Sequence, residues 1–105
     1  RSRSGTCPVR PYVVRPATAR DIAQAYAWYE RQRAGLGEDF LAELQFTIDL
    51  ILTNPLGFPA VFKTTRRALV HRFPYGIFFN IIDETVVFVA CFHTRRSPSV
   101  VKRRR

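Results

Sequence analysis

The residues of this 105-residue chain that could act on a phosphate ester are arginines and one histidine in its second half. His93 closes an apolar segment, and Arg95 and Arg96 follow after a single threonine. Guanidinium groups can stabilise a phosphorane-like transition state while an imidazole transfers a proton, which would amount to RNA cleavage without a metal. The candidate catalytic residues on this interpretation are His93, Arg66, Arg72 and Arg95.

The interpretation that the sequence favours is a binding surface on which His93 is structural. No carboxylate or tyrosine lies close to His93 in the sequence to complete an acid–base pair. His71, the other histidine, is expected at the sheet surface without a direct role. The target-binding residues on this interpretation are Arg66, Arg67, Arg72, His93, Arg95 and Arg96.

Other familiar chemistries find no support in the sequence. Two histidines and two cysteines at no metal-ligand spacing do not predict a metal site, and we expect no metal and no cofactor. There is no glycine-rich phosphate loop or nucleophile elbow, and Asp83-Glu84 is expected to be a hairpin turn. Cys7 and Cys91 make no disulfide framework, and Cys91 is expected to be a small core residue.

The stretch from Arg66 to Arg96 predicts a three-stranded antiparallel meander. It holds three short runs of apolar, β-branched and aromatic residues, and the residues between them are typical of turns. Connections of about three residues allow only hairpins. The strands are expected at 68–73, 77–82 and 86–93, with turns at 74–76 and 83–85.

Two helices are expected before the meander. The first begins at Thr18, with Asp21 completing a capping box, and residues 35–37 end it. The second, from Glu38 to Thr53, has apolar residues at helical spacing. The short loop between the two predicts an antiparallel helical hairpin. Residues 12–15 form a short strand candidate, and residues 54–65 are expected to be an irregular connector.

The predicted fold class is therefore α+β: a short N-terminal strand, an antiparallel two-helix hairpin, then a three-stranded antiparallel meander, with the helices packed on one sheet face. Both faces of the meander are apolar, and two helices can cover only one of them, so the other is expected to be an interface. In the last strand we expect Val86, Phe88, Ala90 and Phe92 on one face and Val87, Val89, Cys91 and His93 on the other.

Length predicts one domain, at 11–98, with an N-terminal arm at 1–10 and a basic tail at 99–105. The net charge is +9, and residues 63–105 carry ten basic residues against Asp83 and Glu84, which suits an acidic partner or a nucleic acid. No apolar run approaches a membrane span, so a cytoplasmic protein without membrane contact is expected. The chain has no methionine, so we do not expect Arg1 to be the native start.

Four segments together resemble the RelE/ParE toxins of type II toxin–antitoxin systems, over about residues 12–98. The helix motif W-Y-E, then G-L-G, then R-R-x-L-x-x-R-F-P-Y-x-I and finally H-x-R-R-x-P make the resemblance specific. The segments are DIAQAYAWYERQRAGLGEDFL, NPLGFP, RRALVHRFPYGIFFNI and VVFVACFHTRRSP.

The resemblance implies a growth-inhibiting toxin that is neutralised when the C-terminal segment of an antitoxin wraps it, in a toxin–antitoxin hetero-oligomer. RelE-like members cleave mRNA on the ribosome, whereas ParE-like members poison DNA gyrase. Here Thr94 follows His93, no tyrosine occurs after Tyr75, and the lysine patch of some nuclease members is reduced to Lys63. These departures, with the long helical hairpin and RFPYGIFF, favour the ParE-like and plasmid-stabilisation branch and a gyrase target.

Two alternatives stay open at this point. One is a RelE-like ribosome-dependent mRNA endoribonuclease that uses His93 and the arginines. The other is a non-enzymatic nucleic-acid-binding module that uses the tail at 102–105. For a toxin of either branch, the antitoxin is expected to bind the meander face that bears Phe78, Ile82, Val87 and Val89, or the opposite face.

Overall fold

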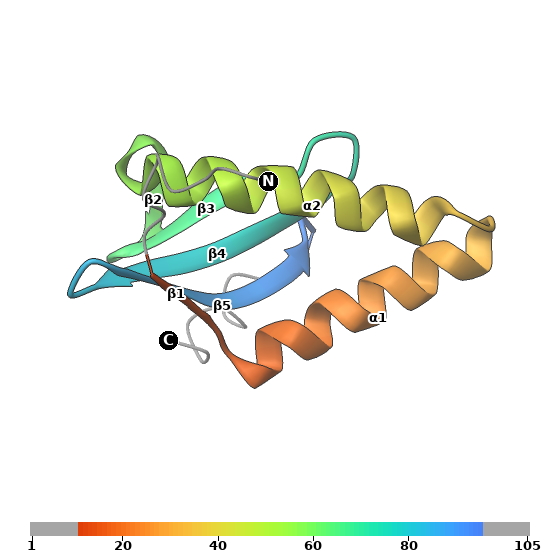
Figure 1. Cartoon of the computed structure of the whole chain (residues 1–105), viewed down its shortest axis with the longest axis horizontal. Helices are drawn as coiled ribbons and strands as arrows, with labels where there is room; N and C mark the ends of the chain where they lie inside the picture. The colour runs from red at the N-terminus through yellow and green to blue at the C-terminus, as the bar shows by residue number, and fades with distance from the viewer. Residues whose placement is uncertain (1–10, 96–105) are drawn as a thin grey trace.

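The computed structural model describes residues 11–95 as two helices lying against one face of a five-stranded sheet (Figure 1). The strand order is β1-β5-β4-β3-β2, in which β1 is parallel to β5 and every other pair is antiparallel. The elements are β1 (Tyr12–Val14), α1 (Pro16–Gln32), α2 (Leu36–Thr53), the 3-10 turn η1 (Pro55–Gly57), β2 (Ala60–Phe62), β3 (Thr65–Leu69), β4 (Tyr75–Ile82) and β5 (Thr85–His93).

The predicted strand, helical hairpin and meander are confirmed, and β2 is an addition. The sequence predicts an irregular connector at 54–65, but residues 60–62 pair with β3 through a tight turn in which Lys63 has a left-handed φ of 50°. A strand of three residues between Pro59 and Lys63 is too short to show an alternating pattern, which is why the sequence gives no sign of it.

The first strand of the meander lies earlier in the chain than expected. It spans Thr65–Leu69, and the chain turns from Val70, whose N–H donates to the Tyr75 carbonyl at 2.9 Å. Arg72 in this turn has a φ of 75°, which a strand cannot accommodate. The hairpin turn predicted at Asp83-Glu84 is confirmed, because both residues have positive φ, as a two-residue hairpin turn requires, but Thr85 already belongs to β5.

The first helix begins at Pro16 rather than at Thr18, and the predicted capping box is wrong. Proline suits the first helical position because its missing N–H would have had no helical partner there. The Thr18 hydroxyl instead donates to the Phe88 carbonyl at 2.9 Å, and the Asp21 carboxylate accepts from the Cys91 N–H at 3.1 Å. Both side chains therefore attach α1 to β5.

The turn between the helices is shorter than expected, since Leu36 and Gly37 already belong to α2. Gly35 adopts a left-handed φ of 90° just before it. The Glu30 carboxylate accepts hydrogen bonds from the N–H groups of Gly35 and Gly37, at 2.9 and 2.8 Å. These first-turn donors have no partner within the helix, so Glu30 of α1 caps α2.

The main core lies between the helices and the sheet, as predicted for one covered face. Phe40 of α2 and Phe79 of β4 are both fully buried there. The helix hairpin is splayed, so that α1 lies along β5 while α2 crosses over β3 and β4 (Figure 1). The buried side chains of this core include Ala25, Tyr29, Phe40, Leu44, Ile51, Ala68, Ile77, Phe79, Val86, Phe88 and Cys91.

A β-bulge in β5 changes which side chains face the helices. Phe78 pairs with Ala90 but Phe79 pairs with Phe88, so Val89 is an extra residue in the ladder. The predicted alternation is therefore wrong beyond Phe88. Cys91 and His93 turn to the helix side, together with Val86 and Phe88, while Ala90 and Phe92 join Val87 and Val89 in a second apolar cluster that contains no helix residue.

Candidate functional site

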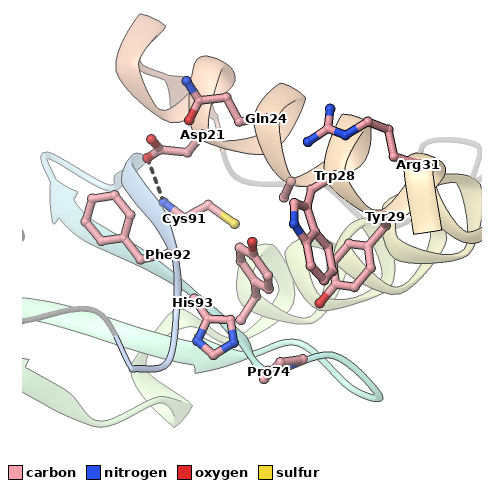
Figure 2. A pocket seen from close by; sticks show the side chains of 11 residues that line it. Asp21, Gln24, Trp28, Tyr29, Arg31, Pro74, Cys91, Phe92 and His93 are labelled. Atoms are coloured by element: carbon pink, nitrogen blue, oxygen red, sulfur yellow. Dashed lines mark hydrogen bonds between the residues drawn. The ribbon is translucent and has the colours of Figure 1, made fainter.

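A pocket of about 690 Å³ lies between α1 and the end of the sheet (Figure 2). One wall is a stripe of α1 that includes Asp21, Gln24, Trp28 and Arg31. These residues recur at three, four and three positions, which places them on one side of a helix. The facing wall is formed by Pro74, Tyr75, Cys91 and His93 at the ends of β4 and β5.

Tyr29 forms the floor of the pocket within a cluster of aromatic rings. Its ring is stacked on Phe40 at 5.4 Å and meets Phe73 and Tyr75 edge-on at 4.9 and 5.9 Å. Burial, and next the neighbouring Tyr75, raise the pKa of Tyr29 above its ordinary value. The phenol therefore stays protonated at neutral pH and presents a neutral wall.

Trp28 stands at the rim of the pocket, with its ring edge-on to Tyr29 at 5.1 Å. It is the one tryptophan of the chain and is 49% exposed. A large aromatic side chain that stays half exposed is unusual, because burying its apolar surface away from water would be favourable.

His93 lies on the opposite wall, beside Tyr75. The two residues are cross-strand partners, and their rings are 5.5 Å apart. The Arg95 N–H donates to Nδ1 of His93 at 3.2 Å, which assigns the proton of a neutral imidazole to Nε2. The hairpin thus places Tyr75 beside His93, although the two lie eighteen positions apart in the sequence. Residues close to His93 in the sequence give no sign of this tyrosine.

The predicted basic residues do not form one cluster in the part of the chain that the structure describes. Arg66 donates to the Phe58 carbonyl, and Arg72 pairs with Glu43 at 3.3 Å. Arg66 pairs with Phe79 and His93 with Tyr75, so the two lie roughly 13 Å apart along β4 alone, at ~3.3 Å per residue.

Arg67 lies on the other face of the sheet. It pairs with Phe78, and its side chain crosses Gly76 so closely that a Cβ there would come within 3.2 Å of it. Arg95 follows the end of β5 and is exposed. Arg96, Cys7 and the basic tail at 102–105 lie outside the described residues.

His71 and Cys91 are unsuited to chemistry for different reasons. His71 is exposed in the turn between β3 and β4, not on the sheet as expected. Cys91 is 2% exposed, and burial, followed by the nearby Asp21, raises the pKa of its thiol to about 12. Because the thiolate is the reactive form, Cys91 is an inert core residue, as predicted.

The four residues predicted to meet an antitoxin lie on the face away from the helices. Val89 and Val87 are only 1% and 8% exposed, whereas Phe78 is half-buried and Ile82 is exposed. Accessible apolar surface on this face is therefore offered by Phe78 and Ile82 rather than by the valines.

Metal ligation and membrane insertion are the two remaining properties of the described residues that bear on function. Within residues 11–95, no group of three or more histidine, cysteine, aspartate or glutamate side chains is placed to hold a metal ion. The helices described here include none with the length and apolar character needed to cross a membrane.

Comparison with known proteins identifies the family. Residues 7–98 match the family described as ParE toxin of type II toxin-antitoxin system, parDE. The chain is also similar in fold to the solved structure "Chromosomal ParDE TA system from P. aeruginosa", with a TM-score of 0.72 at 10% identity, over 81% of this chain and 96% of that chain. No curated protein matches. Since the family match spans most of the sequence, the chain belongs to the ParE toxin family of type II toxin–antitoxin systems.

Proposed function

We propose that this toxin arrests growth in the cytoplasm by poisoning DNA gyrase, and that its arginines and His93 contact the target instead of cleaving RNA. The observation that carries the proposal is the separation of the candidate catalytic residues. Arg66 is bound to the Phe58 carbonyl and Arg72 to Glu43, so neither is directed at the His93 imidazole. Transition-state stabilisation requires donors that converge on one reacting group.

The proposal includes neutralisation by a cognate antitoxin in a hetero-oligomer. Membership of a toxin–antitoxin family supports a protein partner. Phe78 and Ile82, together with Val87 and Val89 beneath them, remain the proposed contact on the face away from the helices. Ile82 is 49% exposed, and an apolar side chain of this kind is available to a partner.

The test is expression of the toxin without antitoxin, combined with an assay of the purified protein. We expect gyrase-dependent DNA breaks in cells and loss of supercoiling of relaxed plasmid by purified gyrase, while the ends of ribosome-bound mRNA stay unchanged. A toxin that leaves supercoiling untouched and cuts mRNA would refute the gyrase target without affecting membership of the family.

The ribosome-dependent mRNA endoribonuclease remains a second candidate because one observation favours it. Tyr75 lies beside His93, so a proton donor or acceptor is available next to the imidazole. On this alternative, His93→Gln would lower the rate of mRNA cleavage by roughly 10²–10⁴-fold, the usual contribution of general acid–base catalysis. Tyr75→Phe would lower it as well while keeping the ring contact. On the gyrase proposal neither variant changes mRNA.

A further inference from the structure

The pocket between α1 and the end of the sheet has the residue types of a protein-binding hot spot. We propose that it holds a large apolar side chain of an antitoxin segment, and that a neighbouring carboxylate of that segment pairs with Arg31. The inference rests on the proposed neutralisation by an antitoxin, and it adds the place and the chemistry of one contact.

The first support is the composition of the rim and floor. Trp28, Tyr29, Tyr75 and Arg31 line one pocket, and tryptophan, tyrosine and arginine are the residues over-represented where binding energy concentrates. The half-exposed ring of Trp28 is the surface that an incoming side chain would remove from water.

The second support is that the walls are already ordered in the free chain. Tyr29 is fixed by Phe40 and Phe73, and Tyr75 lies between Phe40 and His93 at ring distances of 5.2 and 5.5 Å. A partner that binds preformed walls loses less conformational entropy in the complex, and more of the contact energy appears as affinity.

The third support is the charge of the pocket wall, which suits a peptide better than a nucleic acid. The charged residues in the pocket wall are Asp21 and Arg31, one of each sign, and Asp21 already accepts from the Cys91 N–H. Nucleic-acid sites need a markedly positive surrounding for the phosphates. An apolar anchor with one carboxylate fits this nearly neutral site better, and a volume of about 690 Å³ is ample for it.

Occupation of the pocket would also explain neutralisation. His93 forms one wall, and it is among the residues proposed to contact the target. A side chain seated between Trp28 and His93 would cover the imidazole and exclude the target from it. The β-bulge at Val89 is what turns His93 to this side of the sheet.

The test uses the fluorescence of Trp28, the only tryptophan, as a direct report on the pocket. Short random peptides displayed on phage are selected against the full chain, and the enriched peptides are synthesised and titrated. We expect them to share a large apolar residue next to Asp or Glu and to shift Trp28 emission. Trp28→Ala lacks this reporter, so its binding is measured by calorimetry, and it should be weakened by at least ~30-fold, the scale of a hot-spot residue.

Two matched controls locate the effect. Phe46→Ala removes an aromatic ring that is 58% exposed on α2, outside the pocket, and should leave peptide affinity unchanged. Arg31→Glu should weaken binding several-fold and reduce its salt dependence, whereas Arg20→Glu, the same charge change elsewhere on α1, should not.

The proposal is overturned if selection yields no peptides that distinguish the wild type from Trp28→Ala, or if ribonucleoside monophosphates shift Trp28 emission and the peptides do not. A growth assay separates this from failure of the proposed function. If the cognate antitoxin neutralises Trp28→Ala as well as wild type, the pocket is not its anchor and the toxin–antitoxin function stands. If the antitoxin does not neutralise the wild-type toxin, the proposed toxin–antitoxin function is wrong.

Discussion

The helix-covered face of the sheet and the opposite face are both apolar, but different side chains fill them. The covered face is built from interlocking rings, in which Tyr29, Phe40, Phe73 and Tyr75 contact one another, and it ends in an open pocket. The opposite cluster consists mainly of valine and alanine, with the tilted pair Phe78–Phe92 at 6.2 Å. Aromatic pairs adopt preferred edge-on or offset geometries, and Tyr29 and Tyr75 at the end of the ring cluster line the pocket.

The largest effect that tests this difference is expected at Phe40, in the middle of the ring cluster. Phe40→Ala should lower the free energy of unfolding by about 3–5 kcal/mol, the cost of a large cavity in a core. It should also shift Trp28 emission in the folded protein, because the ring beneath Tyr29 is gone. Urea denaturation followed by Trp28 fluorescence and by circular dichroism measures both quantities.

The control for Phe40 lies on the other face. Val87→Ala should cost about 1.5 kcal/mol for two buried methyl groups and leave native Trp28 emission unchanged. An equal emission shift in both variants would show that the two faces are not independent and that the pocket is not shaped by the ring cluster.

Deleting Val89 should have the next largest effect. Because Val89 is the extra residue of the bulge, its removal leaves Phe88 opposite Phe79 and Ala90 opposite Phe78, and His93 stays at the pocket. We expect a loss of roughly 2 kcal/mol from the missing buried side chain, with peptide binding at Trp28 retained. Deleting Val87 instead breaks the pairing between the turn and the bulge and should be far more damaging. A Val89 deletion that unfolds the chain would contradict this account.

Thr18→Val tests the attachment of α1 to β5. The variant keeps the shape of the side chain but leaves the buried Phe88 carbonyl without the hydroxyl, at a cost of about 1–2 kcal/mol. Thr53→Val is the matched control, since its hydroxyl donates to the Asp49 carbonyl at the same 2.9 Å on an exposed surface. Equal losses in thermal or urea denaturation would mean that burial of the Thr18 bond is unimportant.

Helix positions, the hairpin turn at Asp83-Glu84 and the order of the main elements could be predicted because they follow from local periodicity and turn chemistry. The structural roles of Thr18, Asp21 and Val89 could not be predicted. Thr18 and Asp21 resemble a helix cap in the sequence, but their partners are backbone groups seventy positions away. A bulge is a property of two strands, so one strand's alternation cannot reveal it. The pocket depends on both the attachment of α1 and the bulge, so the sequence alone does not predict it.

The smallest effect concerns the Cys91 thiol, which is buried on β5 in the same core as the aromatic rings. Burial, followed by the nearby Asp21, raises the pKa of this thiol from its ordinary value of 9.0 to about 12, so the folded state holds the proton that the unfolded state releases above pH 9. The contribution of Cys91 to the free energy of unfolding is therefore fully present below about pH 9 and is lost progressively towards pH 12. Between pH 8 and pH 10 the free energy of unfolding should fall by about 1.4 kcal/mol through this group. Cys91→Val in a Cys7→Ser background should remove that part of the decline, as measured by urea denaturation at both pH values. If the free energy of unfolding of the Cys91→Val protein falls by the same amount, the pH dependence comes from other groups, such as Tyr29, and the thiol does not contribute to it.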